Sequence, residues 1–310
     1  MTTPSDAVAP RPTGWLSRVA DYAQLTRPRI AVMVVVVVGV SGYVGTRANP
    51  DLRLLAQTML GTFLVAASAS ACAQLLERRL DRLMPRTANR PLPTCRLGAA
   101  QASLFVVLTA CGGLAYLAWA ANWLTVFWAA ATWGAYVGVY TPLKTRSPLN
   151  TLVGAVVGAL PVLIGWSAVG GEWDVRVDPR WAALFLILFY WQFPHFMAIA
   201  WIYREQYERA DMRMVSVLDP TGRTAGRYAV QGALAVLLFS GVPLGMLEGA
   251  AGPSYGYASV AAVLGLAQLW FAVRFYRHRT ERAARWLLRA TVIYLPALLI
   301  ALAVATQLAR

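Results

Sequence analysis

"LLAQTMLGTFLVAASASACAQLLERRLDRLMPRTANRPLP", residues 54–93, changes character halfway along. Residues 54–76 carry no charge and form a run long enough to cross the ~30 Å hydrocarbon core of a bilayer as a helix. A single strand would leave its backbone polar groups unsatisfied in lipid, so a helix is the expected structure. From Glu77 onward, acids and arginines crowd together. The stretch therefore predicts a membrane helix that runs directly into a charged loop.

The same alternation continues along the chain. Of its 310 residues, 58% are hydrophobic and 14% are charged, whereas ~25% are charged in a typical soluble domain. This composition excludes a large soluble domain. The expected transmembrane helices are nine apolar segments: residues 30–46, 54–76, 99–119, 122–140, 150–168, 181–201, 229–247, 255–275 and 286–307. We predict an all-α polytopic membrane helix bundle over residues 30–310, preceded by a cytoplasmic N-terminal tail, residues 1–29.

The basic residues are distributed unequally between the two ends of these segments. The tail and the loops after the second, fourth, sixth and eighth segments hold 23 of the 28 Lys and Arg residues. By the positive-inside rule, this side faces the cytoplasm of a bacterium or the matrix of a mitochondrion. We predict a multi-pass protein of the cell inner membrane, with its C-terminus outside. The net charge of +14 is then a topology signal, and no nucleic-acid partner is expected.

Two acids and two arginines make the first charged loop a candidate site. If the helix continues to Pro85, Glu77 and Asp81 are an i, i+4 pair that faces one way. A divalent cation would relieve their repulsion, and Mg²⁺ readily shares its shell with substrate phosphates. Arg86 and Arg90 follow, and guanidinium groups bind phosphate oxygens in pairs. The loop is therefore equipped to bind a diphosphate, although topology-setting arginines with incidental acids are the alternative interpretation.

Two further loops on the same side carry comparable groups. "YTPLKTRSPLN", residues 140–150, contains Lys144, the single lysine of the chain. "YREQYERADMRM", residues 203–214, places Glu205 and Glu208 at i, i+3 between arginines. Two acidic loops on one membrane face suggest two halves of a metal site, and Lys144 is a candidate phosphate ligand.

One histidine lies inside an apolar segment. His195 belongs to "FYWQFPHFMAIAW", residues 189–201, and Pro194 precedes it. An ionisable group within a membrane segment is a functional candidate by default. A packing histidine with a hydrogen-bond partner is the alternative.

Four stretches carry a resemblance to a known family. They are "LTRPRI" (residues 25–30), "ERRLDRLMPRTANRPLP" (77–93), "YTPLKTRSPLNTLVGAVVGALPVLIGW" (140–166) and "WQFPHFMAIAWIYREQY" (191–207). The chain resembles the protoheme IX farnesyltransferases (haem O synthases), a family of the UbiA-like intramembrane prenyltransferases. The resemblance covers nearly the whole chain and implies the UbiA-like fold with nine helices.

The resemblance also implies a reaction. A farnesyl group passes from farnesyl diphosphate to a vinyl group of protoheme IX (haem b), which makes haem O for terminal oxidases. Mg²⁺ is the implied cofactor. The implied partners are farnesyl diphosphate, haem b and membrane lipid, with haem A synthase or oxidase assembly factors as further candidates.

The residue roles that the resemblance implies follow the matching positions of the motifs. They are catalysis by Glu77, Asp81 and Lys144, diphosphate binding by Arg86, Arg90, Lys144, Arg146 and Arg204, metal binding by Glu77 and Asp81, and haem acceptor binding by His195. Glu205 and Glu208 are further expected metal ligands on the evidence of the acidic second loop itself, and they could replace a missing family ligand only if that loop shifted its register.

Three positions depart from the family pattern. Ala73 replaces an Asn, Gln206 replaces an Asp, and Asp211 replaces a Gly, so each acidic motif lacks one usual ligand. These departures keep two alternatives open: a UbiA-type prenyltransferase with another aromatic acceptor, and a catalytically weakened haem-binding or oxidase-assembly paralogue. A transporter is disfavoured, because the sequence shows no inverted repeat.

Overall fold

The fold is entirely helical in the residues that the computed structural model describes, 14–243 and 251–309, which contain no β-strand. This confirms the predicted all-α class. The helices are α1 (Trp15–Leu25), α2 (Pro28–Gly45), α3 (Leu52–Asp81), α4 (Ala99–Ala120), α5 (Trp123–Gly134), η1 (Ala135–Tyr140), α6 (Thr141–Leu143), α7 (Asn150–Ala159), α8 (Pro161–Ala168), α9 (Arg180–Ile202), α10 (Arg204–Arg209), α11 (Val215–Leu218), α12 (Arg223–Phe239), α13 (Ala251–His278) and α14 (Glu281–Leu308).

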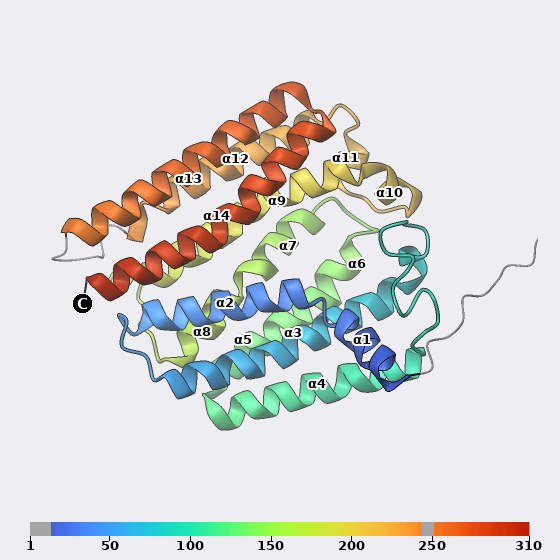
Figure 1. Ribbon diagram of the computed structural model, residues 1–310, viewed down its shortest axis with the longest axis horizontal. Helices are drawn as coiled ribbons and strands as arrows, with labels where there is room; N and C mark the ends of the chain where they lie inside the picture. Colours follow the sequence, from blue (N-terminus) through green and yellow to red (C-terminus); the bar gives the residue numbers. More distant parts are fainter. Residues whose placement is uncertain (1–13, 244–250, 310) are drawn as a thin grey trace, which may run out of the picture.

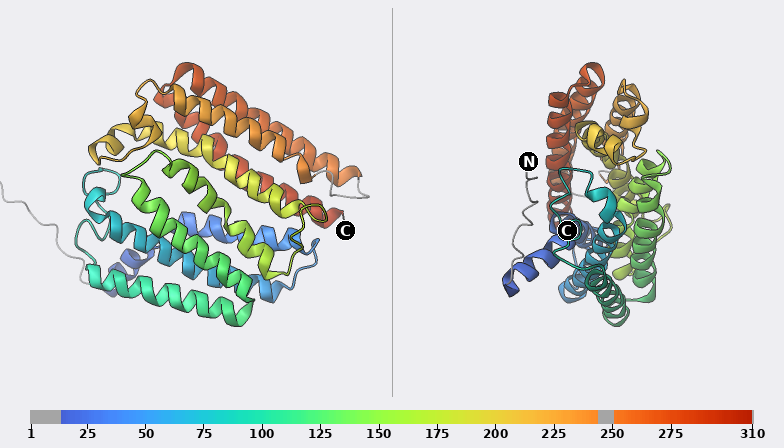
Figure 2. Two further views of the ribbon diagram at one scale, coloured as in Figure 1. Left: turned by 180° about the vertical axis from the view of Figure 1, so that it is seen from behind. Right: turned by 90° about the vertical axis from the view of Figure 1, so that its right-hand side faces the viewer.

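The long helices form two groups that lie side by side (Figure 1). In one group, α9, α12, α13 and α14 pack on one another. In the other, α2, α3, α4, α5 and α8 do so, and α7 packs on α9. The end-on view in Figure 2 shows the two groups one above the other. The short helix α1 lies outside the bundle, beside the loop end of α3.

Seven helices of the described residues are long and apolar enough to cross a membrane. Two of the nine expected segments are not among these seven spans. Segment 122–140 is divided into the 12-residue α5 and the π-helical η1. Segment 229–247 corresponds to α12, which has 17 residues and ends at Phe239, and the segment's last residues lie outside the described part. The membrane bundle is confirmed, and the count of nine spans stays a prediction.

Small residues let the helices approach closely. A Cβ atom on Gly165 of α8 would lie 2.2 Å from the carbonyl oxygen of Val38 on α2. A Cβ atom on Gly158 of α7 would lie 2.2 Å from the side-chain oxygen of Gln192 on α9. The contact at Gly165 excludes any larger residue and brings two helix backbones together, as in other membrane helix pairs, whereas Gly158 makes room for the Gln192 side chain. They seat α7 and α8 in the middle of the bundle.

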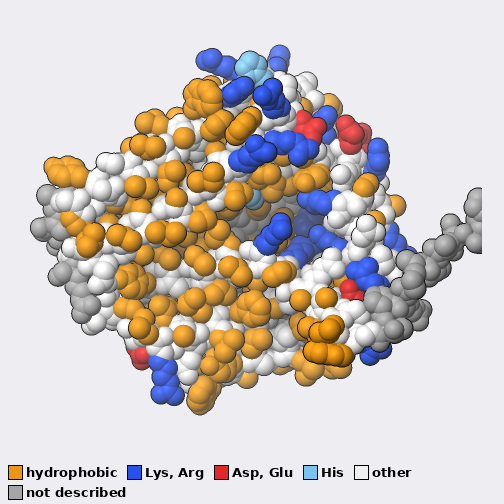
Figure 3. Space-filling model, in the orientation of Figure 1, with side chains coloured by type: hydrophobic (Ala, Val, Ile, Leu, Met, Phe, Trp, Pro, Cys, Tyr) orange, Lys and Arg blue, Asp and Glu red, His pale blue; other side chains and the backbone are white. Residues whose placement is uncertain are grey.

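The periphery and one end of the molecule differ in chemistry. Large apolar side chains such as Leu104, Leu108 and Trp270 are exposed, as expected for a lipid-facing surface. Figure 3 shows hydrophobic side chains over most of this face, whereas Lys and Arg gather towards the right and top. The loops after α3, α6 and α9 meet at the right-hand end of Figure 1. The three charged loops therefore lie at one end of the bundle, as the sequence predicts.

Candidate functional site

The last turn of α3 supplies two buried carboxylates. Asp51 caps the other end of this helix by accepting hydrogen bonds from the backbone N–H groups of Arg53 and Leu54. The helix then runs for 30 residues and ends at Asp81, earlier than the expected end at Pro85. Glu77 is 6% exposed and Asp81 is 1% exposed. The i, i+4 pair predicted from the sequence is thus placed inside the protein.

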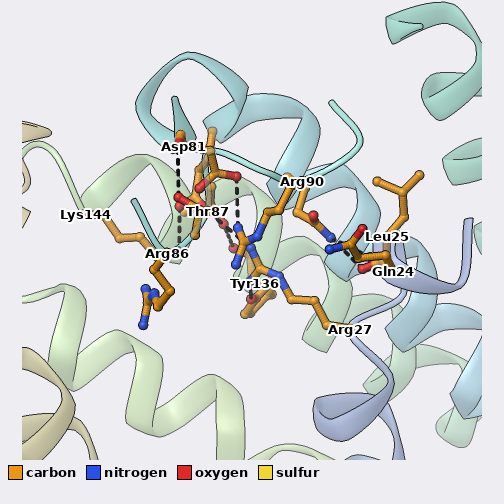
Figure 4. Close-up of polar contacts among 12 residues, drawn as sticks. Gln24, Leu25, Arg27, Asp81, Arg86, Thr87, Arg90, Tyr136 and Lys144 are labelled. Carbon is orange, nitrogen blue, oxygen red and sulfur yellow. Dashed lines mark hydrogen bonds and ion pairs between the residues drawn. The ribbon is translucent and has the colours of Figure 1, made fainter. Parts of the chain in front are cut away.

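Separate cations neutralise the two carboxylates. Lys144 Nζ lies 2.6 Å from Glu77 Oε1, and Arg27 Nη2 lies 3.7 Å from Glu77 Oε2. Arg90 Nη1 lies 2.9 Å from Asp81 Oδ2. Figure 4 shows Arg90, Arg27 and Lys144 converging on the end of α3 from three different segments. Three positive charges thus face two negative ones, and the group, called here the carboxylate–cation cluster, has one positive charge in excess.

The loop after α3 folds back because its own polar groups bind the helix end. Thr87 Oγ1 donates to the backbone oxygen of Asp81 at 2.9 Å and is buried. Arg82 Nε donates to the backbone oxygen of Pro93 at 3.1 Å. These bonds bring Arg90 over Asp81. Burial and the charge of Arg27 lower the pKa of Arg90, but a guanidinium remains charged at any physiological pH.

Lys144 joins the middle loop to both acidic loops. Its ammonium group is buried against Glu77 and lies 4.6 Å from the centre of the Tyr140 ring. Its backbone oxygen accepts a hydrogen bond from Arg213 N at 2.8 Å. Burial alone would lower the pKa of Lys144, but the Glu77 carboxylate and Tyr140 outweigh it and raise the pKa. The Glu77 carboxylate therefore favours the charged form of Lys144.

Arg27 is a site residue that was not predicted. It precedes Pro28 in the turn between α1 and α2, with a φ of 48°. Its Nη1 donates to the hydroxyl of Tyr136 at 3.3 Å, and its buried Nε has no hydrogen-bond partner. Burial opposes its charge, but Tyr136 and Glu77 raise its pKa. The "LTRPRI" stretch was part of the resemblance, yet nothing in its spacing indicates a contact with Glu77.

Arg86 contacts the second acidic loop. Its guanidinium carbon lies 4.3 Å from the centre of the Tyr203 ring, and Nη2 lies 3.4 Å from the Tyr207 hydroxyl. No carboxylate of the described residues pairs with it within 4.0 Å. Arg86 is thus an unneutralised cation between the two acidic loops, a position that suits an anionic ligand.

The other predicted ligands are not brought to the cluster. Glu205 is 70% exposed at its side chain and pairs with Arg204 at 3.5 Å. Glu208 and Arg146 are also exposed. In the described part of the chain, no three His, Cys, Asp or Glu residues lie close enough to hold a metal ion. The predicted four-carboxylate set, Glu77 and Asp81 with Glu205 and Glu208, is therefore not assembled here.

Two of the three departures from the family pattern, Ala73 and Gln206, have different surroundings. Ala73 is fully buried in α3, beside Gln74, whose side chain donates to the backbone oxygen of Leu25 at 2.7 Å. Gln206 Oε1 is buried without a hydrogen-bond partner. Buried acceptors are normally satisfied, so this oxygen lacks a donor or a cation. Oxygen atoms are also the ligands that Mg²⁺ prefers.

An apolar pocket adjoins the cluster. It lies among α2, α3, α5, η1 and α8 and is lined by Ile30, Val34, Thr62, Val65, Ala66, Ala69, Ser70, Ala129, Thr132, Trp133, Tyr136 and Ile164. Tyr136 belongs to both regions, because it lines the pocket and bonds Arg27. The pocket and the cluster together offer contacts for an apolar group and for an anionic one.

His195 lies elsewhere, on α9. Its Nδ1 is 3.0 Å from Thr291 Oγ1 on α14, and its ring stacks on Trp191 at 4.7 Å. The helix continues through Pro194 to Ile202. Figure 3 shows a hollow in the face of the molecule, with Lys and Arg atoms beside it. The histidine is hydrogen-bonded, as the packing alternative expects, yet partly exposed.

Comparisons with known proteins show the family and the fold of the chain. Residues 32–307 match the UbiA prenyltransferase family. The chain is 41% identical to the protoheme IX farnesyltransferase of Rhodopirellula baltica, over 92% of this chain and 99% of that relative. A digeranylgeranylglyceryl phosphate synthase structure has a TM-score of 0.75 at 14% identity, covering 94% of this chain and 99% of that one. An Archaeoglobus fulgidus UbiA homologue bound to DMAPP and Mg²⁺ has a TM-score of 0.70 at 17% identity, covering 92% and 98%.

Proposed function

This chain belongs to the UbiA prenyltransferase family, and we propose that it transfers a farnesyl group from farnesyl diphosphate to a vinyl group of haem b, which forms haem O. The observation that carries the proposal is the carboxylate–cation cluster placed directly beside an apolar pocket. The name of the R. baltica relative supports farnesyl as the transferred group and protohaem IX as the acceptor.

The cations of the cluster bind the diphosphate. Lys144 and Arg27 pair with Glu77, Arg90 pairs with Asp81, and Arg86 has no anionic partner. A bound diphosphate accepts charge-assisted hydrogen bonds from these groups, which are about twice as strong as neutral ones. Arg146 and Arg204 lie further out and meet the substrate on entry, since long-range attraction needs no contact.

The donor set fits Mg²⁺ that arrives with the substrate. Magnesium is usually held by one or two carboxylates together with phosphate oxygens. Glu77 and Asp81 supply the carboxylates, and the unsatisfied oxygen of Gln206 is a further candidate ligand. When bound, the ion stabilises negative charge on the leaving pyrophosphate. Glu205 and Glu208 would join only if the α10 loop moved.

The cluster and the pocket have different roles in the reaction: the cluster stabilises the leaving group, and the pocket binds the farnesyl chain. Cleavage of the C1–O bond sends its electron pair to the pyrophosphate, and Lys144, Arg27 and Arg90 stabilise that charge. The apolar pocket holds the farnesyl chain and keeps water from the allylic cation. The vinyl π electrons of haem attack this cation, and water then adds to the new cation and loses a proton. The product carries a hydroxyethylfarnesyl side chain.

His195 is the proposed contact for the acceptor. It is an ionisable side chain within the membrane span Arg180–Ile202, on the helix group opposite α3. We also propose that the charged loops face the cytoplasm at the inner membrane, with the C-terminus outside, because the basic residues are concentrated on the loop side.

The test is farnesyl transfer by the purified chain in lipid nanodiscs with haem b, farnesyl diphosphate and Mg²⁺, with haem O measured by chromatography. We expect product that disappears with EDTA and with Asp81→Asn. Asp174→Asn is the matched control, because Asp174 lies in an exposed turn between α8 and α9. Binding of haem b without any product would instead favour a haem-binding protein weakened at Ala73 and Gln206, and product from another aromatic acceptor would change the acceptor.

A further inference from the structure

Thr291 on α14 touches His195 through a hydroxyl group whose proton is already used. This threonine is fully buried. Its Oγ1 lies 2.7 Å from the backbone oxygen of Leu288, one turn earlier. A carbonyl oxygen accepts but does not donate, so the hydroxyl proton points to Leu288. Threonine in a helix commonly makes this bond to a preceding carbonyl.

The direction of the second bond follows. Thr291 Oγ1 lies 3.0 Å from Nδ1 of His195. The hydroxyl group of Thr291 has one proton, and it donates that proton in the hydrogen bond to Leu288. Its oxygen can therefore act only as the acceptor of a hydrogen bond from the ring. Nδ1 therefore carries hydrogen, and in a neutral imidazole Nε2 is then an unprotonated lone-pair donor.

The same threonine also holds the aromatic neighbour of the histidine. Trp191 Nε1 donates to the backbone oxygen of Thr291 at 2.8 Å. The Trp191 ring lies against His195 with 21° between the planes. One residue of α14 thus fixes both the tautomer of His195 and the ring that supports it. Among the described residues, the hydrogen bond of the His195 ring is made through Nδ1, and none is found at Nε2.

We propose that Thr291 is a positioning residue that holds His195 in the Nδ1–H tautomer, so that its bare Nε2 is directed to the iron of the haem acceptor. The iron-binding part rests on the proposed function, whereas the tautomer does not. Histidines that bind metals typically donate their other ring N–H to an oxygen, which fixes the tautomer and makes the free nitrogen a better ligand.

The tautomer is tested without any substrate. The chain has two histidines, and His278 is exposed, so His278→Gln leaves a single ring for ¹⁵N NMR of the full chain in nanodiscs. At about pH 8, above the ordinary histidine pKa of ~6.5, we expect a protonated Nδ1 and an unprotonated Nε2. Thr291→Val should shift the ring to the Nε2–H form or to a mixture, and Thr291→Ser should restore it.

The matched control is Thr306→Val. Thr306 also lies on α14 and makes the same kind of bond, to the backbone oxygen of Leu302 at 2.7 Å, but it contacts no histidine. We expect it to leave the tautomer unchanged. A wild-type ring protonated at Nε2 overturns the proposal, even if Thr291→Val does not fold. So does a folded Thr291→Val that keeps the Nδ1–H form.

A second measurement tests the iron. Ferric haem b is added to each variant, and optical and EPR spectra report whether a histidine nitrogen binds the iron. We expect this signature in the wild type, its loss in His195→Ala, and at least a fivefold smaller fraction in Thr291→Val than in Thr306→Val. A wild type with the Nδ1–H tautomer but without the nitrogen signature overturns the iron-directed role. That outcome leaves farnesyl transfer to be decided by its own assay.

Discussion

The two acidic loops have similar sequences and very different surroundings. "ERRLD", residues 77–81, ends a 30-residue helix that lies inside the bundle, so Glu77 and Asp81 are buried and paired. "REQYER", residues 204–209, is a six-residue helix that buries Tyr207 and leaves Glu205 and Glu208 in solvent. The difference shows that acids next to arginines in the sequence form a buried charged site only when the helix that carries them packs against other helices.

The largest expected effect comes from removing Lys144, the cation that pairs with the buried Glu77 and bonds to the second acidic loop. Lys144→Met leaves Glu77 buried with only the longer contact to Arg27. Breaking a buried pair destabilises by roughly 3–5 kcal/mol, and the diphosphate loses one ligand. We expect farnesyl transfer to fall at least about a hundredfold, which corresponds to ~2.7 kcal/mol.

Arg176→Met is the control for that change, because Arg176 is a basic side chain that is 89% exposed between α8 and α9 and has no proposed role in the site. Single-turnover transfer with both variants in nanodiscs, beside thermal unfolding, separates lost chemistry from lost stability. Equal activity of the two variants would contradict the role given to Lys144.

A second prediction concerns the unsatisfied oxygen in the α10 loop. Gln206→Asp replaces the buried amide oxygen by a carboxylate. If this position faces the ion brought by the substrate, the Mg²⁺ concentration for half-maximal activity should fall about tenfold, or ~1.4 kcal/mol. Glu205→Asp is the control at an exposed neighbouring position. A Mg²⁺ titration in which Gln206→Asp matches the wild type would remove Gln206 from the metal site.

A third prediction separates a buried hydroxyl from an exposed one in the first loop. Thr87→Val deletes the buried bond to the Asp81 backbone that brings Arg90 over the carboxylate. A lost hydrogen bond of this kind destabilises by about 1 kcal/mol, with the KM for farnesyl diphosphate rising roughly fivefold. Thr94→Val removes a more exposed bond, to the backbone oxygen of Arg90. Steady-state kinetics should show the first effect without the second.

Much of this contrast could be predicted from the sequence, because it depends on local spacing. The apolar run before Glu77 predicted the long helix, and the i, i+4 spacing placed both acids on one face of it. The partners were harder to predict. Lys144 pairs with an acid 67 positions away, and Arg27 bonds a tyrosine 109 positions away. No periodicity encodes such contacts, since they depend on how the helices pack.

The same limit explains the other differences. Segment 122–140 reads as one apolar helix, but its second part is wound as the π-helix η1, which hydropathy cannot distinguish from an α-helix. Thr291, 96 positions from His195, has no local signal that links it to the histidine. By contrast, Glu205 and Glu208 are exposed because α10 is a short helix that buries only Tyr207. The number of acids in the loop gave no information about their burial.

The smallest effect is expected for Glu208→Gln, in the exposed second acidic loop. A large effect of this substitution would contradict the difference between the two loops. Glu208→Gln changes an exposed carboxylate that makes no ion pair within 4.0 Å in the described residues. Exposed charges contribute little and are screened by salt, so we expect less than about a twofold change in farnesyl transfer and less than ~0.5 kcal/mol in stability. Asp81→Asn, measured in the same Mg²⁺ titration, shows how much farnesyl transfer is lost when a buried ligand is removed. If Glu208→Gln matched that loss, α10 would have to turn inward when substrate binds, and the second acidic loop would be a metal half-site after all.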